Sequence, residues 1–411
     1  MSPSSAKELL IMNSPKLRFK NFNDEWKTFK IQDTFVFLST NSLSRDSLNY
    51  NNGTIQNIHY GDIHTILPTI CNVNKERLPY INYNAIYKNT NFMQENDLLI
   101  ADASENYDDI GKSIEVIELG NRKIVGGLHT LLLRCELNLF APKFKGYLFN
   151  TNNIRTQIKI LSVGAKVLGI SKDNLKKITF YLPSLEEQTK IANFLSLIDR
   201  KIEIQEKLVE NLKLYKKGLL QKVFSNNLGW KSIKLSQVLF ERKVYAEKGQ
   251  YTHVSLTIDG IIDKSERYDR DFLVTHQNKK YKITKYNDIC YNPANLKFGV
   301  ICRNNFGTAI FSPIYVTFEI SKLANPIFIS LYLSDNSFIN KVRKYEEGTV
   351  YERMSVKPED LLKVNIKIPS IEEQNRIANL FSNLDKKIEF ETKKLQDLKT
   401  YKKGLLQKMF I

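Results

Sequence analysis

The chain has 411 residues, which is too long for one ordinary hydrophobic core and suits two to four domains. Hydrophobic residues make up 42% of it and aromatic residues 11%, which excludes intrinsic disorder for the bulk of the chain. A formal charge of +17 favours nucleic acid as a partner, although a merely basic surface would give the same count.

Cysteine spacing and hydropathy exclude several further classes of protein. Cys71, Cys135, Cys290 and Cys302 are scattered, so they fit neither a zinc motif nor a disulfide framework. The first fifteen residues hold too short an apolar stretch for a signal peptide, and no run is long enough to span a bilayer. We therefore expect a soluble, cytoplasmic protein with reduced thiols and no membrane partner.

A tail over residues 1–16 precedes a first variable segment over 17–182, which mixes β-rich runs with turns. Its predicted elements are strands at 97–101, 114–119 and 131–135, a turn at Gly126-Gly127 and helical residues at 144–159. We interpret the segment as an α+β domain.

Residues 183–225 predict a long helix. Pro183 lies outside it, and Ser184 stands three residues before Glu187, which is the spacing of a capping box. Seam residues then recur in steps of four and three for about five heptads, as in a coiled coil. These seam positions are Ile191, Leu195, Ile198, Ile202, Gln205, Val209, Leu212, Lys216, Leu219 and Val223.

A second variable segment covers residues 226–368. It opens on Trp230, as the first opens on Trp26, and these are the only two tryptophans of the chain. Asn96-Asp97 and Asn287-Asp288 indicate the same strand in the two segments. The predicted elements are strands at 288–291, 299–303 and 315–320 and helical residues at 326–345.

Residues 369–411 repeat the long helix. Residues 183–224 and 369–410 align without a gap at an offset of 186, with 25 of 42 positions identical, so the chain is a duplicated pair of domain and helix. Pro369, Ser370 and Glu373 repeat the helix start. The second seam consists of Ile377, Phe381, Leu384, Ile388, Glu391, Leu395, Leu398, Lys402, Leu405 and Met409.

Two such helices in one chain favour pairing with each other, because tethering gives a high effective concentration. The alternative is that each helix lies on the surface of a domain. Polar residues at equivalent seam positions, Gln205/Glu391 and Lys216/Lys402, can fix register. In an antiparallel pair, each lysine would lie near the N-terminal half of the other helix.

We therefore predict an α+β fold in which an antiparallel two-helix coiled coil separates two mixed α/β domains. About 39 residues make a rod of roughly 55–60 Å. Such a rod would act as a ruler and let the two domains contact duplex DNA about one turn apart, at roughly 34–36 Å.

Basic and amide side chains in predicted loops are candidates for reading base edges or anchoring phosphates, although most such residues on a basic domain are simply solvated. The candidate DNA-binding residues are Asn41, Ser44, Arg45, Lys112, Lys166, Lys279, Lys280, Asn295, Lys297, Arg303, Asn304 and Arg353. The candidate coiled-coil and partner-binding residues are Glu187, Ile191, Leu195, Ile198, Ile202, Leu212, Tyr215, Glu373, Ile377, Leu384, Ile388, Leu398 and Tyr401.

Signals for catalysis or metal binding are lacking in the sequence. It has no Walker A loop and no Gly-x-Gly-x-x-Gly, and the five histidines, at positions 59, 64, 129, 253 and 276, form no metal-ligand spacing. Asn292-Pro-Ala-Asn295 faintly resembles the Asn-Pro-Pro-Tyr motif of adenine methyltransferases. It lacks the second proline and the aromatic residue, so a turn after a strand is favoured.

The repeated residues carry a family resemblance. They are Glu187-Gln188, Ile191-Ala192, Asp199, Lys201-Ile202 and Tyr215–Lys222, each with a counterpart 186 residues on, with Gly61-Asp62-Ile63 and Asp97-Leu98-Leu99 as weaker matches. Over nearly its whole length the chain resembles the DNA-specificity subunit of type I restriction–modification enzymes.

This resemblance implies a non-catalytic chain that binds double-stranded DNA, with each domain reading half of an asymmetric site and the helices setting the gap. It implies two modification subunits, which methylate adenine with S-adenosylmethionine, and two restriction subunits, which are motor-nucleases that hydrolyse ATP with Mg²⁺. The chain itself would bind none of these cofactors. The outer helix face, including Glu186, Glu187, Tyr215 and Lys217, would dock the modification subunits.

Two alternatives remain at this point. The chain could be a stand-alone nuclease or methyltransferase, or it could be a coiled-coil DNA-binding scaffold or repressor.

Overall fold

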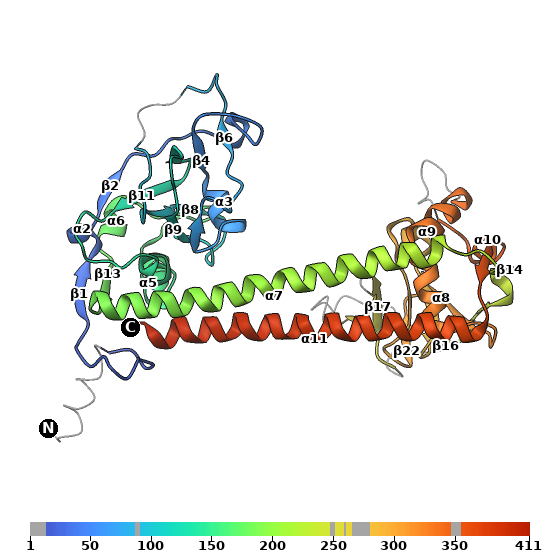
Figure 1. The fold of residues 1–411 in the computed structure, drawn as a ribbon. Coiled ribbons are helices and arrows are strands. Elements are labelled where there is room, and N and C mark those ends of the chain that lie inside the picture. The colour runs from blue at the N-terminus through green and yellow to red at the C-terminus, as the bar shows by residue number, and fades with distance from the viewer. Residues whose placement is uncertain (1–13, 87–90, 247–250, 259, 265–279, 347–354) are drawn as a thin grey trace. The chain divides into compact units, whose positions relative to one another are not determined.

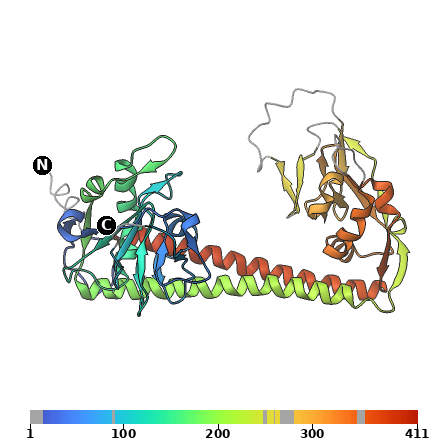
Figure 2. The same cartoon turned by 90° about the horizontal axis from the view of Figure 1, so that it is seen from above.

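The computed structural model describes residues 14–86, 91–246, 251–258, 260–264, 280–346 and 355–411 (Figures 1 and 2). The chain forms two compact units. The first contains Met1–Ile204 and Leu395–Ile411, and the second contains Gln205–Lys394. Each unit holds one variable segment, called its variable domain below, and part of both long helices. No helix in the described part of the chain is both long enough and apolar enough to cross a membrane.

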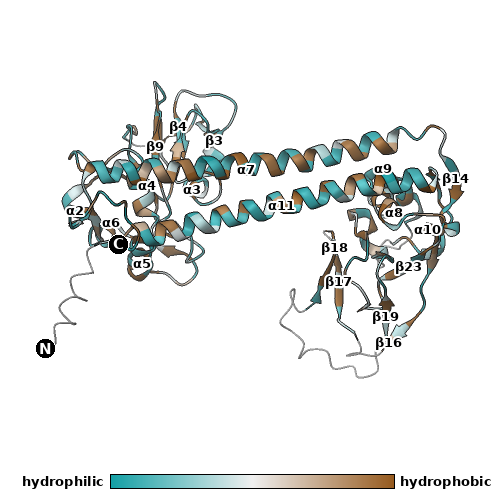
Figure 3. Ribbon diagram, turned by 60° about the horizontal axis from the view of Figure 1, so that its bottom comes forward, coloured by the Kyte–Doolittle hydropathy of each residue, from teal (hydrophilic) through white to brown (hydrophobic). Residues whose placement is uncertain are grey.

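The two long helices are α7, Leu185–Ser225, and α11, Ile371–Met409, as the repeat predicts. The Ser184 and Ser370 hydroxyls accept hydrogen bonds from the backbone N–H groups three residues on, at 3.3 and 3.4 Å. Every predicted seam position is buried or half-buried. Apolar and polar residues alternate along both helices (Figure 3) because the seam residues recur on one side of each helix.

Contacts between the helices show antiparallel pairing. In the second unit, Gln205 of α7 contacts Glu391 of α11, and Lys216, further along α7, contacts Asp385, which lies earlier in α11. In the first unit, Lys402 of α11 contacts Asp199 of α7. Each seam lysine therefore lies beside the N-terminal half of the other helix, which confirms the predicted direction of pairing.

The first variable domain is built on two sheets. The larger has the order β2-β11-β7-β9-β5, in which only the β5–β9 pair is parallel, and the smaller has the order β10-β4-β6-β3. The strands of the larger sheet are Val36–Leu38, Thr130–Arg134, Leu98–Ala101, Ser113–Ile117 and Ile70–Asn72, in that order. Those of the smaller sheet are Ile124–Gly126, Gln56–Ile58, Tyr80–Ile81 and Leu48–Asn49.

Short elements complete this domain. A two-stranded pair, β1 (Lys27–Lys30) with β13 (Thr179–Leu182), leads directly into α7, and β8 (Ala103–Ser104) pairs with β12 (Leu168–Gly169). The helices are α2 (Ile31–Thr34), η1 (Arg45–Ser47), α3 (Tyr60–Thr65), α4 (Phe144–Phe149), α5 (Asn152–Leu161) and α6 (Lys172–Lys176).

The second variable domain repeats this plan with one strand fewer in each sheet. The strand orders are β15-β23-β20-β21 and β16-β19-β22. Their strands are Leu239–Glu241, Val316–Ile320, Ile289–Tyr291 and Ile301–Arg303, then Tyr245–Ala246, Tyr281–Thr284 and Ala309–Phe311. The remaining strands are β14 (Lys231–Lys234) paired with β24 (Asn365–Ile368), and β17 (Val254–Thr257) paired with β18 (Gly260–Asp263).

The helices of the second variable domain are short. They are η2 (Leu235–Gln237), η5 (Pro293–Phe298), α8 (Pro326–Leu333), α9 (Asn336–Val342), η6 (Arg343–Tyr345) and α10 (Pro358–Leu362). The turn expected at Asn292–Asn295 is the start of η5, where the Asn292 side chain accepts a hydrogen bond from the Ala294 N–H at 3.1 Å.

Two predicted equivalences between the halves are confirmed. The strand after each tryptophan, β1 or β14, pairs with the strand just before the long helix, β13 or β24. Asn96 and Asn287 both adopt positive φ angles, of 65° and 72°, and the strand that starts two residues later, β7 or β20, lies inside the sheet. The Asn-Asp pairs therefore do mark the same strand.

The helical stretches predicted at 144–159 and 326–345 differ from the structure, because each is interrupted. Thr151 and Asp335 have extended backbone, with ψ angles of 156° and 139°, and end one helix before starting the next. The Asp335 carboxylate accepts a hydrogen bond from the Ser337 N–H at 2.9 Å, so this side chain competes with helix continuation.

The starts of the long helices belong to the domain cores. Leu195 and Ile198 of α7 are in the first core, and Phe381 of α11 is in the second. Gln188 and Gln374 are both buried and make the same bonds in the two units. Each donates to the carbonyl of the proline before its helix at 3.0 Å, and each accepts from a backbone N–H of its variable domain. Each helix is therefore anchored to the domain that precedes it.

Candidate DNA interface

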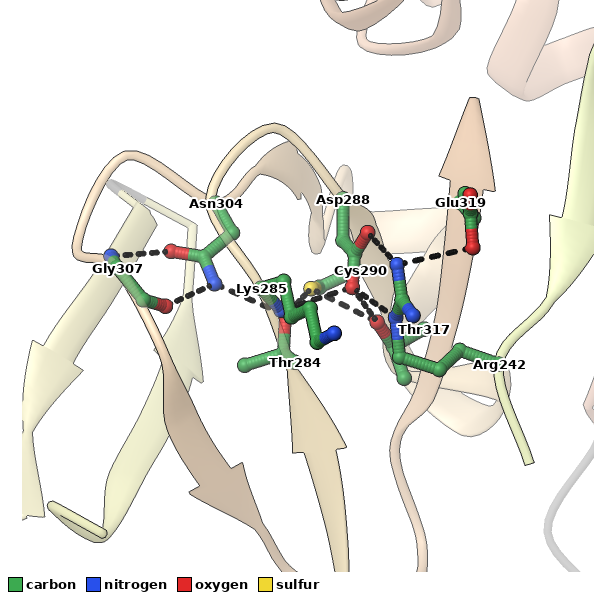
Figure 4. Close-up of polar contacts among 9 residues, drawn as sticks. All are labelled: Arg242, Thr284, Lys285, Asp288, Cys290, Asn304, Gly307, Thr317 and Glu319. Atoms are coloured by element: carbon green, nitrogen blue, oxygen red, sulfur yellow. Dashed lines mark hydrogen bonds and ion pairs between the residues drawn. The ribbon is translucent and has the colours of Figure 1, made fainter. Parts of the chain in front are cut away.

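A buried carboxylate organises the N-terminal end of β20 (Figure 4). Asp288 accepts hydrogen bonds from Arg242 Nε at 2.7 Å and Nη2 at 2.9 Å, and from the Lys285 N–H at 2.8 Å. Arg242 also contacts Glu319 at 3.1 Å. The carboxylate closes the turn from Lys285 to Asp288 and so holds the backbone that carries the exposed Tyr286.

The first variable domain contains the same arrangement. Asp97 accepts from Arg134 Nε at 2.9 Å and Nη2 at 2.6 Å, and from the Gln94 N–H at 2.8 Å. Its arginine comes from the neighbouring strand β11, whereas Arg242 directly follows β15. The two domains therefore contain equivalent turns that are held by an Asp–Arg pair. The arginine comes from a different strand in each domain.

Arg303 lies beside this turn in the second domain. Its guanidinium stacks over the Tyr286 ring, 5.7 Å from the centroid, and Nη1 donates to Asn287 Oδ1 at 2.8 Å. The side chain is half-buried, so its orientation is held before any ligand binds. A guanidinium presented in this way next to an aromatic ring suits phosphate or guanine.

Asn304 is more deeply buried than its neighbour Arg303. It is fully buried, and its amide donates to Thr284 Oγ1 at 2.9 Å and to the Gly307 carbonyl at 2.7 Å. Its Oδ1 accepts from the N–H groups of Phe306 and Gly307 (Figure 4 shows the latter). The side chain therefore shapes the loop that exposes Phe306 and has no free polar atom for a base.

The C-terminal end of β20 holds further candidates. Lys297 lies over the exposed ring of Phe298, with Nζ 5.3 Å from the centroid, and Asn295 is half-buried in η5. Lys280 is exposed. Lys279 and Arg353 lie outside the described residues.

In the first domain, three histidines surround Tyr60, and one of them, His129, comes from a distant part of the sequence. The rings of His59, His64 and His129 lie 4.6, 5.5 and 5.3 Å from its ring, centroid to centroid. His129 Nδ1 is 3.2 Å from Asp102 Oδ1, just beyond the C-terminal end of β7. These three histidines were assigned no role in the sequence because their spacing fits no metal motif.

Two predicted DNA contacts flank this cluster. Arg45 forms a two-pronged ion pair with Asp62, at 2.9 and 3.2 Å, and Nη2 is 3.5 Å from His59 Nδ1. Lys112 donates to the His64 carbonyl at 3.0 Å and pairs with Asp109 at 2.5 Å. Both cations keep an exposed edge although each is paired with a carboxylate, so the structure brings Arg45 and Lys112 beside the same aromatic cluster.

Burial affects the titration of this cluster. It lowers the pKa of His59 and of His64, and the positive charge of Arg45 lowers the pKa of His59 further. Burial raises the pKa of Asp102. The two histidines are therefore neutral at neutral pH, and as neutral rings they can accept or donate hydrogen bonds.

In the described part of the chain, the remaining candidates of the first domain make no hydrogen bond or ring contact with Tyr60 or the three histidines; they are Asn41, Ser44 and Lys166. Asn41 is buried and donates to Asn57 Oδ1 at 2.7 Å and to the Gly126 carbonyl at 3.0 Å, so it is used inside the domain. Ser44 and Lys166 are exposed.

The candidate helix residues separate into two groups. The apolar ones line the seam or the domain cores, whereas Tyr215 and Tyr401 are 62% and 53% exposed. Glu187 is buried in an ion pair with Arg18, and Glu373 is half-buried. Arg18 was not predicted, because nothing in its local sequence marks a partner 169 residues away.

No group of three or more histidine, cysteine or acidic residues in the described ranges could hold a metal ion. The four cysteines are free thiols. Burial raises the pKa of Cys71 and of Cys302 to about 12, so these thiols are protonated and unreactive at neutral pH.

Comparison with known proteins identifies relatives across both halves. A family model described as type I restriction modification DNA specificity domain matches residues 23–214 and 229–400. The putative type I restriction enzyme MjaX specificity subunit of Methanocaldococcus jannaschii is 27% identical over 322 residues, covering 72% of this chain and 73% of the relative. The MjaVIII specificity subunit of the same organism is 24% identical over 293 residues, covering 63% and 68%.

Solved structures show the same fold. The S subunit of a type I restriction–modification system from M. genitalium matches with a TM-score of 0.55 and 16% identity, covering 97% of this chain and 99% of that one. A chain from a structural study of complex assembly and conformational transition in the type I R-M system matches with a TM-score of 0.56 and 12% identity, covering 93% and 96%.

Proposed function

The chain belongs to the family of type I restriction–modification DNA specificity proteins, whose function is DNA sequence recognition, and we propose that it reads a bipartite, asymmetric site on double-stranded DNA. In this proposal each variable domain reads one half of the site. The paired helices set the length of the unread gap between the halves.

The observation that carries this proposal is that two domains with one framework present different chemistry. The turns before β7 and β20 are held by the same Asp–Arg pair. At the C-terminal ends of these strands, the first domain has the Tyr60 and histidine cluster with Arg45 and Lys112, whereas the second has Lys297 and Phe298. Surfaces with different donors and rings select different bases, so the two half-sites differ in sequence.

Modification subunits are the proposed partners of the outer helix face. Apolar side chains on α7 and α11 point away from the seam and remain exposed, which is typical of a docking surface rather than of a solvated helix. They include Leu197, Ile204, Leu214, Tyr215, Phe390 and Tyr401. Glu186 and Lys217 are exposed as well, but the buried Glu187 is not available. Because the helical surface occurs twice, we propose two modification and two restriction subunits per chain.

Catalysis is assigned to these partners. S-adenosylmethionine, ATP and Mg²⁺ would bind to the modification and restriction subunits, which use this chain to select where adenine is methylated or DNA is cleaved. The rival hypothesis, a stand-alone nuclease or methyltransferase, is tested by incubating the purified chain with DNA, Mg²⁺ and S-adenosylmethionine. Turnover without partner subunits would overturn the assignment.

Footprinting tests the DNA reading directly. We expect two protected patches of about 3–5 bp each, within one to two helical turns of each other. The double variant Arg45→Ala/Lys112→Ala should lose one patch only, and Lys297→Ala/Phe298→Ala the other. Lys176→Ala, which removes an exposed lysine of α6, is the matched control and should keep both. One continuous palindromic footprint would contradict the proposal and favour a repressor-like scaffold.

A further inference from the structure

The N-terminal arm, defined here as residues 14–24, covers the start of α7. Arg18 Nε and Nη2 each donate to a carboxylate oxygen of Glu187 at 2.8 Å, and the Glu187 side chain is only 1% exposed. Phe19 packs edge-on against Phe194, with ring centroids 5.9 Å apart. Lys190 Nζ lies 5.1 Å from the centre of the Phe19 ring. An adjacent arginine and phenylalanine thus occupy a site made of a carboxylate, a cation and a hydrophobic side chain on one helix face.

The same site occurs on α11, where no described residue covers it. The residues 186 positions after Glu187, Lys190 and Phe194 are Glu373, Arg376 and Leu380, and these three are called the second-repeat site. The Glu373 side chain is 45% exposed and forms an ion pair with Arg376 at 3.3 Å. Arg376 is 79% exposed and Leu380 is 49% exposed. The second-repeat site therefore keeps an acidic, a basic and an apolar side chain at the three positions, but these side chains are exposed.

The repeat explains why the cover is missing. The first variable domain is preceded by the arm, a segment outside any helix. The second variable domain is preceded by α7 itself, which ends at Ser225, five residues before Trp230. The chain therefore has no second arm in the corresponding place.

We propose that the second-repeat site binds a segment of a separate partner polypeptide in which an arginine is followed by an aromatic residue. The arginine would pair with Glu373, and the aromatic ring would pack on Leu380 beneath the Arg376 guanidinium, as Arg18 and Phe19 do on α7. A second copy of this chain is a poorer occupant, because its own arm is already bound to its own Glu187. The inference does not depend on DNA recognition.

A synthetic peptide with the sequence of residues 14–24 serves as the probe. Binding of the labelled peptide to the full chain, followed by fluorescence anisotropy, should be saturable with one peptide per chain. The site on α7 should not take up peptide, because the tethered arm competes at an effective concentration in the millimolar range. A peptide with Arg18→Ala or Phe19→Ala should bind at least about tenfold more weakly.

Variants of the chain locate the binding. Glu373→Lys and Leu380→Asp should each lower the peptide affinity at least about tenfold, and the milder Glu373→Gln should lower it measurably. Glu389→Lys, the same charge change at an exposed position of α11, and Leu197→Asp, at an exposed apolar position of α7, are the matched controls and should not change it. All four positions are exposed or half-exposed, so the five variants are expected to fold.

Three results would overturn the proposal. They are no saturable binding of the peptide up to about 1 mM, equal binding by Glu373→Lys and the wild-type chain, and a dimer of this chain in sedimentation that Glu373→Lys abolishes. The last result would identify a second copy as the occupant. DNA footprints of Glu373→Lys should match the wild type, so failure of this inference is distinguishable from failure of the DNA-binding proposal.

Discussion

Gln205 and Glu391 occupy the same position of the two repeats, and they hydrogen-bond to each other. Gln205 Nε2 donates to Glu391 Oε2 at 2.7 Å and to the Glu391 carbonyl at 3.0 Å. In an antiparallel pair of repeats, equivalent positions meet at only one level, so this contact defines the register. Sliding one helix by a heptad would separate both polar groups from their partners in an apolar seam.

Substitution of Gln205 tests this role. Gln205→Leu should destabilise the chain by about 1–3 kcal/mol, because it leaves the largely buried Glu391 carboxylate without its donor. Gln205→Leu/Glu391→Leu should be close to neutral in urea unfolding, since both polar groups are removed. Equal destabilisation by the single and double variants would show that the hydrogen bond does not matter.

Arg303 is expected to contact the second half-site. Arg303→Glu should weaken DNA binding and reduce the dependence of log K on log salt by about one unit, because one phosphate or base contact is lost. Arg303→Lys keeps the charge but loses the flat surface that stacks on Tyr286, and should be intermediate. Lys322→Glu, the same charge reversal at an exposed position of that domain, is the control. An unchanged affinity and salt dependence in Arg303→Glu would exclude the residue from the interface.

The length of the helices is expected to set the gap between half-sites. The stretch of α7 from Gln205 to Lys216 lies against the stretch of α11 from Asp385 to Glu391. A heptad inserted after Leu212, with a matching heptad after Ile388, keeps the seam in phase and adds about 10 Å. The gap should grow by about 3 bp, at 3.4 Å per bp, with both half-sites unchanged. Altered half-site sequences, measured by selection from random DNA, would contradict the ruler.

The first unit should lose stability in mild acid. Burial lowers the pKa of His59 and of His64 below the ordinary value of 6.5, so the folded state binds these protons less tightly than the unfolded state. The corresponding stability is complete above pH 6.5 and is lost as the pH falls through the lower folded values.

Trp26 fluorescence can follow this unit in a Trp230→Phe background, since each unit contains one tryptophan. The urea midpoint should fall between about pH 7 and about pH 5, and it should fall less in His59→Gln/His64→Gln. Arg45 and Asp62 lie beside His59, and Lys112 and Asp109 lie beside His64, and these neighbours are common to both proteins. An identical pH dependence of the two proteins would refute the assignment.

The parts of the fold that the sequence predicts are those with a local or periodic signal. The seam recurs every seven residues, and the Ser-x-x-Glu spacing marks where each helix begins, so α7 and α11 were found within two residues of their observed starts. The Asn-Asp pairs marked β7 and β20, because a positive φ angle favours asparagine and the buried aspartate closes the turn.

The interface was less predictable, because its residues meet only through the fold. Arg45, Tyr60, Lys112 and His129 converge from distant positions in the sequence, and their local sequences carry no sign of this. Asn304 has the composition of a contact residue, yet the loop turns its amide inward. Whether an amide reads a base or holds a loop depends on backbone geometry, which the residue type does not encode.

Mapping of methylated adenines across a genome that carries this chain with its partner subunits tests the central claim most directly. We predict one asymmetric, two-part motif with a fixed unspecified gap, in which Arg45→Ala/Lys112→Ala relaxes only one part and Lys297→Ala/Phe298→Ala only the other. A continuous or palindromic motif, or relaxation of both parts by either variant, would contradict the account.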